Sequence, residues 1–274
     1  MSPTDETVYL SAFFHFFAYS MSYYISSVSG TNRGIGYSLP AQSHIAARPS
    51  TIVFAGARDP TAQSLKDLAA KHPNVHPVKL TSGDQADNEA AIAEIQKTAG
   101  RLDVLIANAG IAKYAGMFTT TPLSEFRDHW EVNTLGTVVM FQAAHALLLA
   151  SPTGAPIFAY ISSAGGSMAR YYHAQSAAYG SSKAAANFFI KVLDAEHPSL
   201  IAVAIHPGWV ATEMGNSGAA RMGLPAAPVM VEDSVKGVMS KIDGATKEKS
   251  SGRFWNFCAD SGRPWDIETE EIPW

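Results

Sequence analysis

The feature that most limits how this chain can fold is its alternation of short apolar runs with longer segments of helical periodicity. Four largely apolar runs, rich in Val, Ile, Leu and Ala, occupy residues 51–55, 102–107, 156–161 and 200–205, and a more polar strand is expected at 75–80. Continuous apolar runs of this length are typical of strands that are buried on both faces of a sheet. Alternation of such strands with helices and short loops favours a doubly wound parallel sheet. With a strand before Gly30 and another at 253–257, we predict an α/β fold of about seven strands.

Composition is consistent with one domain over residues 1–274 and narrows the range of functions. The chain has 274 residues, of which 47% are hydrophobic and 16% are charged, enough for one large core. A net charge of −4, without a run of Lys or Arg, argues against a nucleic-acid or anionic-membrane partner. Cys258 is the single cysteine, which suits a reducing compartment, so we expect a cytoplasmic protein. Cys and His residues lack metal-ligand spacing, and we expect no metal.

The N-terminal part of the chain can be interpreted in several ways. Residues 11–28 are aromatic-rich and uncharged if the histidine among them is neutral. A signal peptide or membrane anchor is one interpretation, although the preceding residues are acidic rather than basic; a surface extension is another. We favour an insertion at 11–27, because residues 7–10 joined to Val28 form an uninterrupted first strand. Such an insertion arises when an untranslated segment is kept in the gene model. If the stretch is genuine protein, we expect the strand at 24–29.

A glycine-rich turn joins the first strand to the next helix. Gly30, Gly34 and Gly36 have the spacing Gly-x-x-x-Gly-x-Gly, and a helix is expected from Gly34 to about residue 47. Glycine permits a tight turn and a close approach of a ligand to the backbone, and the N-terminus of a helix favours phosphate groups. Because the turn lies between a strand and a helix, we interpret it as the phosphate site of a dinucleotide.

The end of the second strand indicates which dinucleotide is bound. Arg58 follows the run at 51–55, and Arg33 lies within the glycine turn. An arginine at this strand end accommodates the 2′-phosphate of NADP, whereas an acidic residue binds the free 2′-hydroxyl of NAD. The two arginines therefore favour NADP(H). Asp59 is a competing signal, since its carboxylate either favours NAD or caps the following helix.

The candidate catalytic pair is Tyr179 and Lys183. The two residues are four positions apart in a segment of helical periodicity, which places them on one face of the helix. An ammonium group beside a phenol stabilises the phenolate, so we expect Lys183 to lower the pKa of Tyr179. A tyrosine of lowered pKa is a usable proton donor and acceptor near neutral pH. The spacing alone is common by chance, and the assignment depends on the other motifs of the chain.

Several apolar residues are expected to surround a substrate. Residues 213–230 carry few charges and are rich in Gly, Ala, Pro and Met, and we expect a mobile flap over a pocket, with an ordinary surface loop as the alternative. The residues in segments that would line the cleft are Tyr114, Met117, Phe118, Tyr171, Tyr172, Trp209 and Met214. Packing or loop cover is the competing explanation for these side chains.

Taken in order, the motifs resemble those of the short-chain dehydrogenase/reductase family over roughly residues 28–257. The matching positions are the glycine turn with Ile35, then Asn108-Ala109-Gly110, Asn133, Ser163, Tyr179 with Lys183, and Pro207-Gly208 with Thr212. The resemblance implies a single-domain Rossmann-type fold and NAD(P)-dependent oxidation or reduction of a small molecule without a metal. It also implies a homodimer or homotetramer built on the helices at 123–150 and 176–196.

The resemblance implies a role for each matched position. Tyr179 would donate a proton to a ketone oxygen, Ser163 would position that oxygen, Lys183 would hold the nicotinamide ribose and Asn133 would hold a water. The implied cofactor-binding residues are Gly30, Asn32, Arg33, Gly34, Ile35, Gly36, Arg58, Thr81, Asn108, Ala109, Gly110, Tyr179, Lys183, Pro207, Val210 and Thr212. The chain departs from the family pattern in two places. A long gap before Tyr179 leaves Ser167 as an alternative to Ser163, and Thr81-Ser82 replaces the usual aspartate after the third strand.

Within the family, the chain is similar to NADPH-dependent carbonyl reductases, and most of all to the fungal norsolorinic acid ketoreductases of aflatoxin and sterigmatocystin pathways. Residues 5–10, the segment 233–254 and the terminal Pro273-Trp274 carry this likeness. It implies reduction of a ketone on an aromatic polyketide to a secondary alcohol, with NADP(H) as cofactor. A non-catalytic NADP(H)-binding sensor or scaffold on the same fold remains an alternative. A membrane-attached steroid or lipid reductase is a third interpretation, and it depends on residues 11–28.

Overall fold

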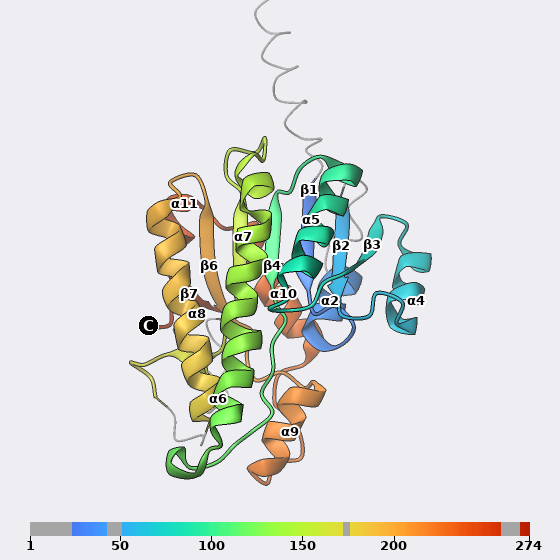
Figure 1. The fold of residues 1–274 in the computed structure, drawn as a ribbon. Coiled ribbons are helices and arrows are strands. Elements are labelled where there is room, and N and C mark those ends of the chain that lie inside the picture. Colours follow the sequence, from blue (N-terminus) through green and yellow to red (C-terminus); the bar gives the residue numbers. More distant parts are fainter. Residues whose placement is uncertain (1–23, 43–50, 172–175, 259–268) are drawn as a thin grey trace, which may run out of the picture.

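The protein was analysed as a computed structural model, which describes residues 24–42, 51–171, 176–258 and 269–274. Its centre is a seven-stranded sheet in the order β3-β2-β1-β4-β5-β6-β7, in which every neighbouring pair is parallel. The strands are β1 (Tyr24–Ser29), β2 (Thr51–Ala57), β3 (Val75–Lys79), β4 (Val104–Ala107), β5 (Ile157–Ile161), β6 (Ile201–His206) and β7 (Arg253–Asn256). This arrangement confirms the predicted doubly wound parallel sheet (Figure 1).

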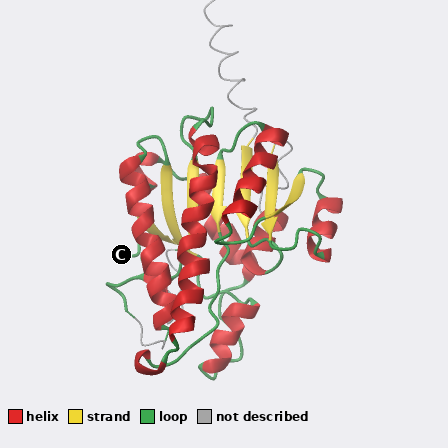
Figure 2. Ribbon diagram, viewed as in Figure 1, coloured by secondary structure: helices red, strands yellow, loops and turns green. Residues whose placement is uncertain are grey.

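Helices cover both faces of the sheet (Figure 2). The core on one face is formed with α5 (Gln85–Ala99), α7 (Gly136–Leu149) and α8 (Ala177–Glu196). The core on the other face is formed with α2 (Gly34–Gln42), α4 (Gln63–Lys71) and α10 (Val231–Asp243). Side chains of a strand point alternately to the two faces, so each central strand supplies both cores. In β6, for example, Val203 packs into the core that contains α10, whereas Ala204 packs into the core that contains α8.

Strand β1 is an interior strand of the sheet, between β2 and β4. Its bounds are those expected if residues 11–27 are genuine protein. Residues 7–10, which would begin the alternative first strand, lie outside the described residues. Two of its side chains are unusual for a central strand, because Ser26 and Ser27 are buried and their hydroxyl oxygens have no hydrogen-bond partner within the described parts of the chain. A buried hydroxyl without a partner is destabilising.

The long helical segment predicted at 123–150 is interrupted by a π-helical turn. Helix α6 (Leu123–His129) continues through the turn η2 (Trp130–Leu135) into α7. Such turns are frequent at functional sites, and this one contains Asn133. By length and composition, the run Leu123–Leu149 is the one helix of the described chain that could cross a membrane, but half of its apolar window is buried inside the protein. Partial burial of this kind is typical of a core helix.

Residues 213–230, predicted to form a mobile flap or a surface loop, begin with a regular helix, and the mobility of the segment stays a prediction. Residues Glu213–Arg221 form an α-helix, α9, which lies beyond the carboxyl edge of the sheet (Figure 1). Its start is set by the N-cap Thr212, whose hydroxyl oxygen accepts a hydrogen bond from the backbone N–H of Gly215 at 3.2 Å. A threonine cap satisfies one of the free N–H groups of the first turn, which compensates for the weak helix propensity of the glycines that follow.

Candidate active site

The predicted site residues gather at the carboxyl edge of the sheet, the lower edge in Figure 1. Gly30 follows β1, Asn108 follows β4, Ser163 follows β5 and Pro207 follows β6. Tyr179 lies in the first turn of α8, at the same edge. In open parallel sheets, ligands bind in the crevice beyond this edge. The topology therefore brings together segments that are far apart in the sequence.

The glycine turn is shaped so that only glycine fits at its key positions. Gly30 and Gly34 have φ angles of 71° and 58°, in the left-handed region that disfavours other residues. A Cβ atom at Gly36 would collide with the carbonyl oxygen of Gly30 and with Nδ2 of Asn108. The turn thus forms a close-fitting cradle at the N-terminus of α2, which fits a pyrophosphate group.

Asn108, Ala109 and Gly110 form the floor of the cradle. The Asn108 side chain donates to the carbonyl oxygen of Ser29 at 2.9 Å. The backbone N–H groups of Asn108 and Ala109 both donate to the Ser29 hydroxyl at 3.0 Å. A Cβ at Gly110 would lie 3.1 Å from Oδ1 of Asn133 and 3.5 Å from Nζ of Lys183. This segment therefore joins the glycine turn to the predicted catalytic residues.

The structure distinguishes the roles of Arg58 and Asp59 at the end of β2. One carboxylate oxygen of Asp59 accepts hydrogen bonds from the backbone N–H and the hydroxyl of Thr61, at 2.9 and 2.6 Å. These bonds lower the pKa of Asp59. Asp59 is therefore occupied in the turn before α4, whereas Arg58 is exposed at the carboxyl edge. Arg33, the second predicted arginine, forms an ion pair with Glu213.

Ser163 and Tyr179 lie together, and Ser167 does not belong to the pair. The hydroxyl of Ser163 forms a hydrogen bond with Tyr179 and accepts the N–H of Gly165 at 3.2 Å. Burial raises the pKa of Tyr179, and the Ser163 bond opposes that rise. Ser167 instead donates to the carbonyl oxygen of Pro273 at 2.6 Å and accepts from the backbone N–H of Arg170 at 3.1 Å. The geometry thus favours Ser163 over Ser167.

Lys183 is enclosed by carbonyl and aromatic groups. Its Nζ donates to the carbonyl oxygen of Ile161 at 2.9 Å and lies 4.7 Å from the centre of the Tyr160 ring. Burial lowers the pKa of Lys183 to about 7. The expectation that Lys183 lowers the pKa of Tyr179 is corrected here. Burial has a larger effect on Tyr179 than the Ser163 hydrogen bond. It raises the pKa of Tyr179 because burial disfavours the charged phenolate.

Asn133 fastens the loop that follows the Asn108-Ala109-Gly110 segment. Its Oδ1 accepts the N–H of Ile111 at 2.8 Å, and its Nδ2 donates to the carbonyl oxygen of Ile111 at 3.0 Å and to Oγ of Ser182 at 2.9 Å. Its side-chain amide is thus bonded to protein atoms, and the predicted role of holding a water stays a prediction. Asn133 positions the loop and ties it to α8 next to Lys183.

Two residues near the pair were not singled out from the sequence. His129 is fully buried; its Nδ1 donates to the carbonyl oxygen of Glu125 at 2.6 Å, and its Nε2 accepts the N–H of Lys113 at 3.2 Å. Its ring meets that of Tyr179 edge-on, with ring centres 6.4 Å apart. Tyr160 provides the aromatic face below Lys183. The available signal for His129 was its spacing of four residues from Asn133, which places both on one helix face.

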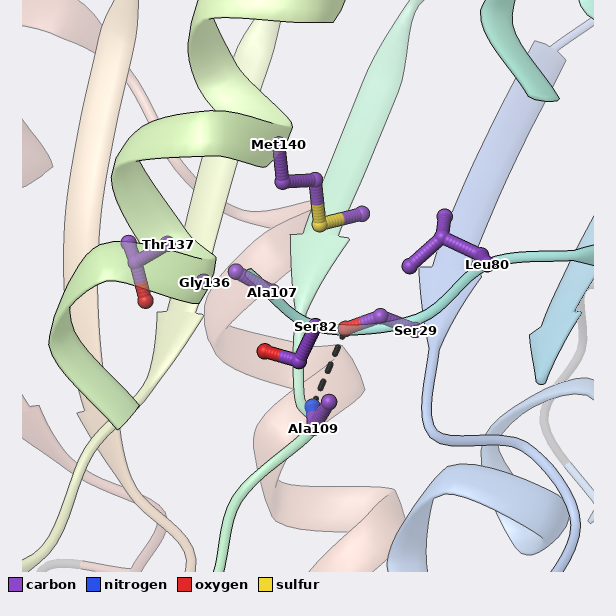
Figure 3. A pocket seen from close by; sticks show the side chains of 8 residues that line it. All are labelled: Ser29, Leu80, Ser82, Ala107, Ala109, Gly136, Thr137 and Met140. Atoms are coloured by element: carbon purple, nitrogen blue, oxygen red, sulfur yellow. Dashed lines mark hydrogen bonds between the residues drawn. The ribbon is translucent and has the colours of Figure 1, made fainter. Parts of the chain in front are cut away.

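A small cavity lies beside the cradle, between the end of β4, the start of α7 and the segment after β3 (Figure 3). Its lining residues are Ser29, Leu80, Ser82, Ala107, Ala109, Gly136, Thr137 and Met140. Thr81, the predicted cofactor residue of this segment, does not line the cavity, and its hydroxyl is hydrogen-bonded to Asp87. Ser82, the next residue, lines the cavity instead, and its hydroxyl donates to the carbonyl oxygen of Val132 at 2.8 Å.

The remaining predicted residues frame the same crevice. Val210 forms a bridge with Val229, and a Cβ at Gly34 would lie 3.4 Å from Cγ2 of Thr212, so the glycine turn and the segment after β6 face each other closely. The carbonyl oxygen of Pro207 accepts from the Ser234 hydroxyl at 2.6 Å. The side chains of two predicted cofactor-binding residues lie away from this site. Asn32 is exposed, and Ile35 packs against the core on the α10 face.

Comparison with known proteins places this geometry in a family. A family model described as short chain dehydrogenase matches residues 25–222. The norsolorinic acid ketoreductase of Dothistroma septosporum is 37% identical over 246 residues, which cover 87% of this chain and 91% of that protein. The norsolorinic acid ketoreductase of Aspergillus parasiticus is 35% identical over 274 residues, covering 96% and 93%.

A solved structure agrees with the sequence comparison. The NADPH-bound carbonyl reductase from chicken fatty liver superimposes with a TM-score of 0.76 at 30% identity, over 91% of this chain and 98% of that one. The matched family region contains the glycine turn and the cluster of Ser163, Tyr179 and Lys183. On the sequence match, the fold and the arrangement of these motifs, the chain belongs to the short-chain dehydrogenase/reductase family of oxidoreductases.

Proposed function

We propose that the protein is an NADPH-dependent ketoreductase that reduces a ketone to a secondary alcohol. The observation that carries this proposal is the cluster of Ser163, Tyr179 and Lys183 at the carboxyl edge, directly beside the glycine cradle. The names of the relatives support ketone reduction, and the NADPH in the chicken carbonyl reductase supports the cofactor.

The residues present fit a bound NADP(H). The glycine cradle and the start of α2 would receive the pyrophosphate, and Arg58 with Arg33 would receive the 2′-phosphate. Lys183, whose Nζ would lie 3.5 Å from a Cβ at Gly110, and Thr212, which lies against the glycine turn, would hold the nicotinamide half. The cofactor, when bound, supplies the hydride that is transferred to the carbonyl carbon. The chain itself supplies the proton and the orientation of the ketone.

Tyr179 is the proposed proton donor. Its phenol, still protonated at neutral pH because burial raises its pKa, donates to the carbonyl oxygen of the substrate. Ser163, hydrogen-bonded to Tyr179, donates a second hydrogen bond to that oxygen and fixes its position. A charge on Lys183, whose Nζ lies 5.9 Å from the centre of the Tyr179 ring, stabilises the tyrosinate that remains after proton transfer. His129 and Asn133 hold the surrounding backbone.

We further propose an aromatic polyketide as the substrate, within fungal secondary metabolism. Large apolar side chains are exposed on three segments beyond the carboxyl edge, which suits a flat hydrophobic ligand. These side chains are Met117 and Phe118 after β4, Met168 and Tyr171 after β5, Met214 on α9 and Met222 directly after it. Tyr172, another predicted lining residue, lies outside the described residues. The names of the two relatives support this substrate class.

The test is NADPH consumption against a panel of aromatic ketones with two substituted enzymes. Tyr179→Phe is expected to lower kcat by at least about 100-fold, the usual contribution of a general acid, while NADP⁺ binding stays intact. Ser163→Ala is expected to lower kcat, whereas the matched Ser167→Ala enzyme keeps it, because Ser167 bonds only to the chain. Wild-type turnover by Tyr179→Phe would refute the mechanism. Activity on aliphatic ketones alone would refute the substrate class.

Two further expectations remain proposals. We propose a cytoplasmic location, supported by the single cysteine, and a homodimer or homotetramer, supported by the family's usual assembly. Cell fractionation tests the first, and sedimentation velocity tests the second. A membrane-bound or strictly monomeric protein would contradict them.

A further inference from the structure

The ion pair between Arg33 and Glu213 joins two parts of the cofactor crevice. Arg33 belongs to the glycine turn, and Glu213 is the first residue of α9, 180 positions later in the sequence. Both side chains are largely exposed, at 66% and 75% of their surface. Exposed ion pairs are readily exchanged for other partners. The pair is thus open to competition by a ligand that enters the crevice.

The backbone around this pair shows that it spans the crevice at a narrow point. Gly34, next to Arg33, would bring a Cβ within 3.4 Å of Thr212, next to Glu213. The glycine turn is the segment that would receive the phosphates, and Thr212 stands on the opposite wall. The guanidinium of Arg33 is therefore held by an acidic group on that wall in the protein without cofactor.

We propose that Glu213 is a specificity-determining residue, because its carboxylate competes with the 2′-phosphate of NADP for the guanidinium of Arg33. The inference rests on the proposed NADP(H) cofactor. A guanidinium binds a phosphate through paired hydrogen bonds as well as it binds a carboxylate, and the phosphate carries more charge. NADP displaces Glu213 from Arg33, whereas NAD, which lacks the 2′-phosphate, leaves the ion pair in place. Glu213 thereby weakens the binding of NADP without affecting that of NAD.

The test compares dinucleotide affinities by isothermal titration calorimetry, without turnover. Glu213→Gln is expected to tighten NADP⁺ binding about three- to fivefold, the range that an exposed ion pair allows, and to leave NAD⁺ binding unchanged. The gain is expected to shrink as salt is added, because exposed charges are screened. Glu248→Gln is the matched control. Glu248 is also an exposed acid in the first turn of a helix, so its removal changes the net charge equally.

A second variant separates competition for Arg33 from any other effect of Glu213. In an Arg33→Met background, Glu213→Gln is expected to change NADP⁺ affinity by less than about twofold, since the shared guanidinium is gone. Unchanged or weaker NADP⁺ binding by the single Glu213→Gln variant would overturn the inference, and so would an equal gain for NAD⁺. A wild-type protein that does not bind NADP⁺ at all would overturn the proposed function instead.

Discussion

Lys183 shows how strongly a buried environment alters one side chain. Its Nζ has one carbonyl partner, Ile161, and otherwise faces the rings of Tyr160 and Tyr179. Burial without a carboxylate partner disfavours the charged form, which is why the pKa falls to about 7. The charge of this lysine is therefore sensitive to pH near neutrality. A group with such a pKa links protonation to stability.

We predict that the stability of the protein without cofactor rises with pH because of Lys183. The folded chain releases this proton near pH 7, whereas the unfolded chain keeps it up to the ordinary value of 10.5. Between these values the unfolded state binds more protons, so the free energy of unfolding increases with pH, by at most about 1.4 kcal/mol per unit. Tyr179 does not oppose this rise between pH 7 and 9, because burial raises its pKa from 10.0 and the phenol stays protonated in both states there.

Chemical denaturation at pH 7, 8 and 9 measures this slope. Lys183→Met removes the titrating group, so the variant is expected to be more stable than wild type at pH 7 and to show a smaller slope. Equal slopes for the two proteins would show that Lys183 keeps its proton in the folded state.

The sequence identifies the individual site residues more reliably than it predicts their pKa values. Tyr179 and Lys183 are recognisable because their spacing is local to one helix. Their pKa values depend on burial, and Tyr160 and His129, which come from other parts of the chain, pack against Lys183 and Tyr179. Spacing carries no information about such contacts. Asn133 was identified through the family resemblance, which did not indicate its partner, the Ile111 backbone.

Among the elements, α8 carries Tyr179 and Lys183 at one end and is secured at the other by a lysine. Lys247 begins the short helix α11 (Lys247–Ser250). Its Nζ donates to the carboxylate of Asp194 at 2.7 Å and to three backbone carbonyl oxygens: that of Asp194 at 3.0 Å, of His197 at 3.2 Å and of Leu200 at 2.9 Å. A cation at a helix C-terminus satisfies its free carbonyl groups and complements the helix dipole.

We predict that Lys247→Met lowers the free energy of unfolding by about 2–3 kcal/mol, because a partly buried carboxylate and several carbonyl groups lose their donor. The value of kcat is expected to stay near wild type, since Tyr179 lies at the far end of α8. Lys249→Met is the control, as its exposed side chain lies in the same short helix. Thermal denaturation and steady-state kinetics supply the two measurements. Equal melting temperatures for both variants would mean that Lys247 does not secure the helix.

The strands were predictable and α9 was not, for a physical reason. Buried strands such as β5 and β6 are continuous apolar runs bounded by turn residues, a signal contained within each segment. Helix α9 contains two glycines, an asparagine and a serine, which have low helix propensity. Its formation depends on the Thr212 cap and on the contact of Trp209 Nε1 with the Gly215 carbonyl oxygen at 3.0 Å. These contacts are set by the turn after β6.

For the whole molecule, the order of elements was enough to predict the sheet and the edge at which the site lies. Parallel strands joined by helices leave few arrangements, and all of them place the strand ends together. The central strand was the exception, because two segments of the chain have the character of a first strand. Strand β1 places Ser26 and Ser27 in the two cores, where their hydroxyl groups have no hydrogen-bond partner among the described residues. The alternative strand would place Tyr9 and Leu10 at these positions, counting back from Val28.

We predict that deletion of residues 11–27 stabilises the protein. The deletion joins Leu10 to Val28 and replaces two unpaired buried hydroxyls, each of which costs about 1–3 kcal/mol, by a larger apolar surface. The double variant Ser26→Ala/Ser27→Ala, in the full-length chain, is the control that removes the hydroxyls alone. It is expected to gain about 1–2 kcal/mol, and the deletion is expected to gain more. Denaturant unfolding of the three proteins gives the comparison, with NADP⁺ binding as the check that β1 still positions the glycine turn. A deletion variant less stable than the full chain would show that residues 11–27 are part of the fold, and β1 would then be the native central strand despite its serines.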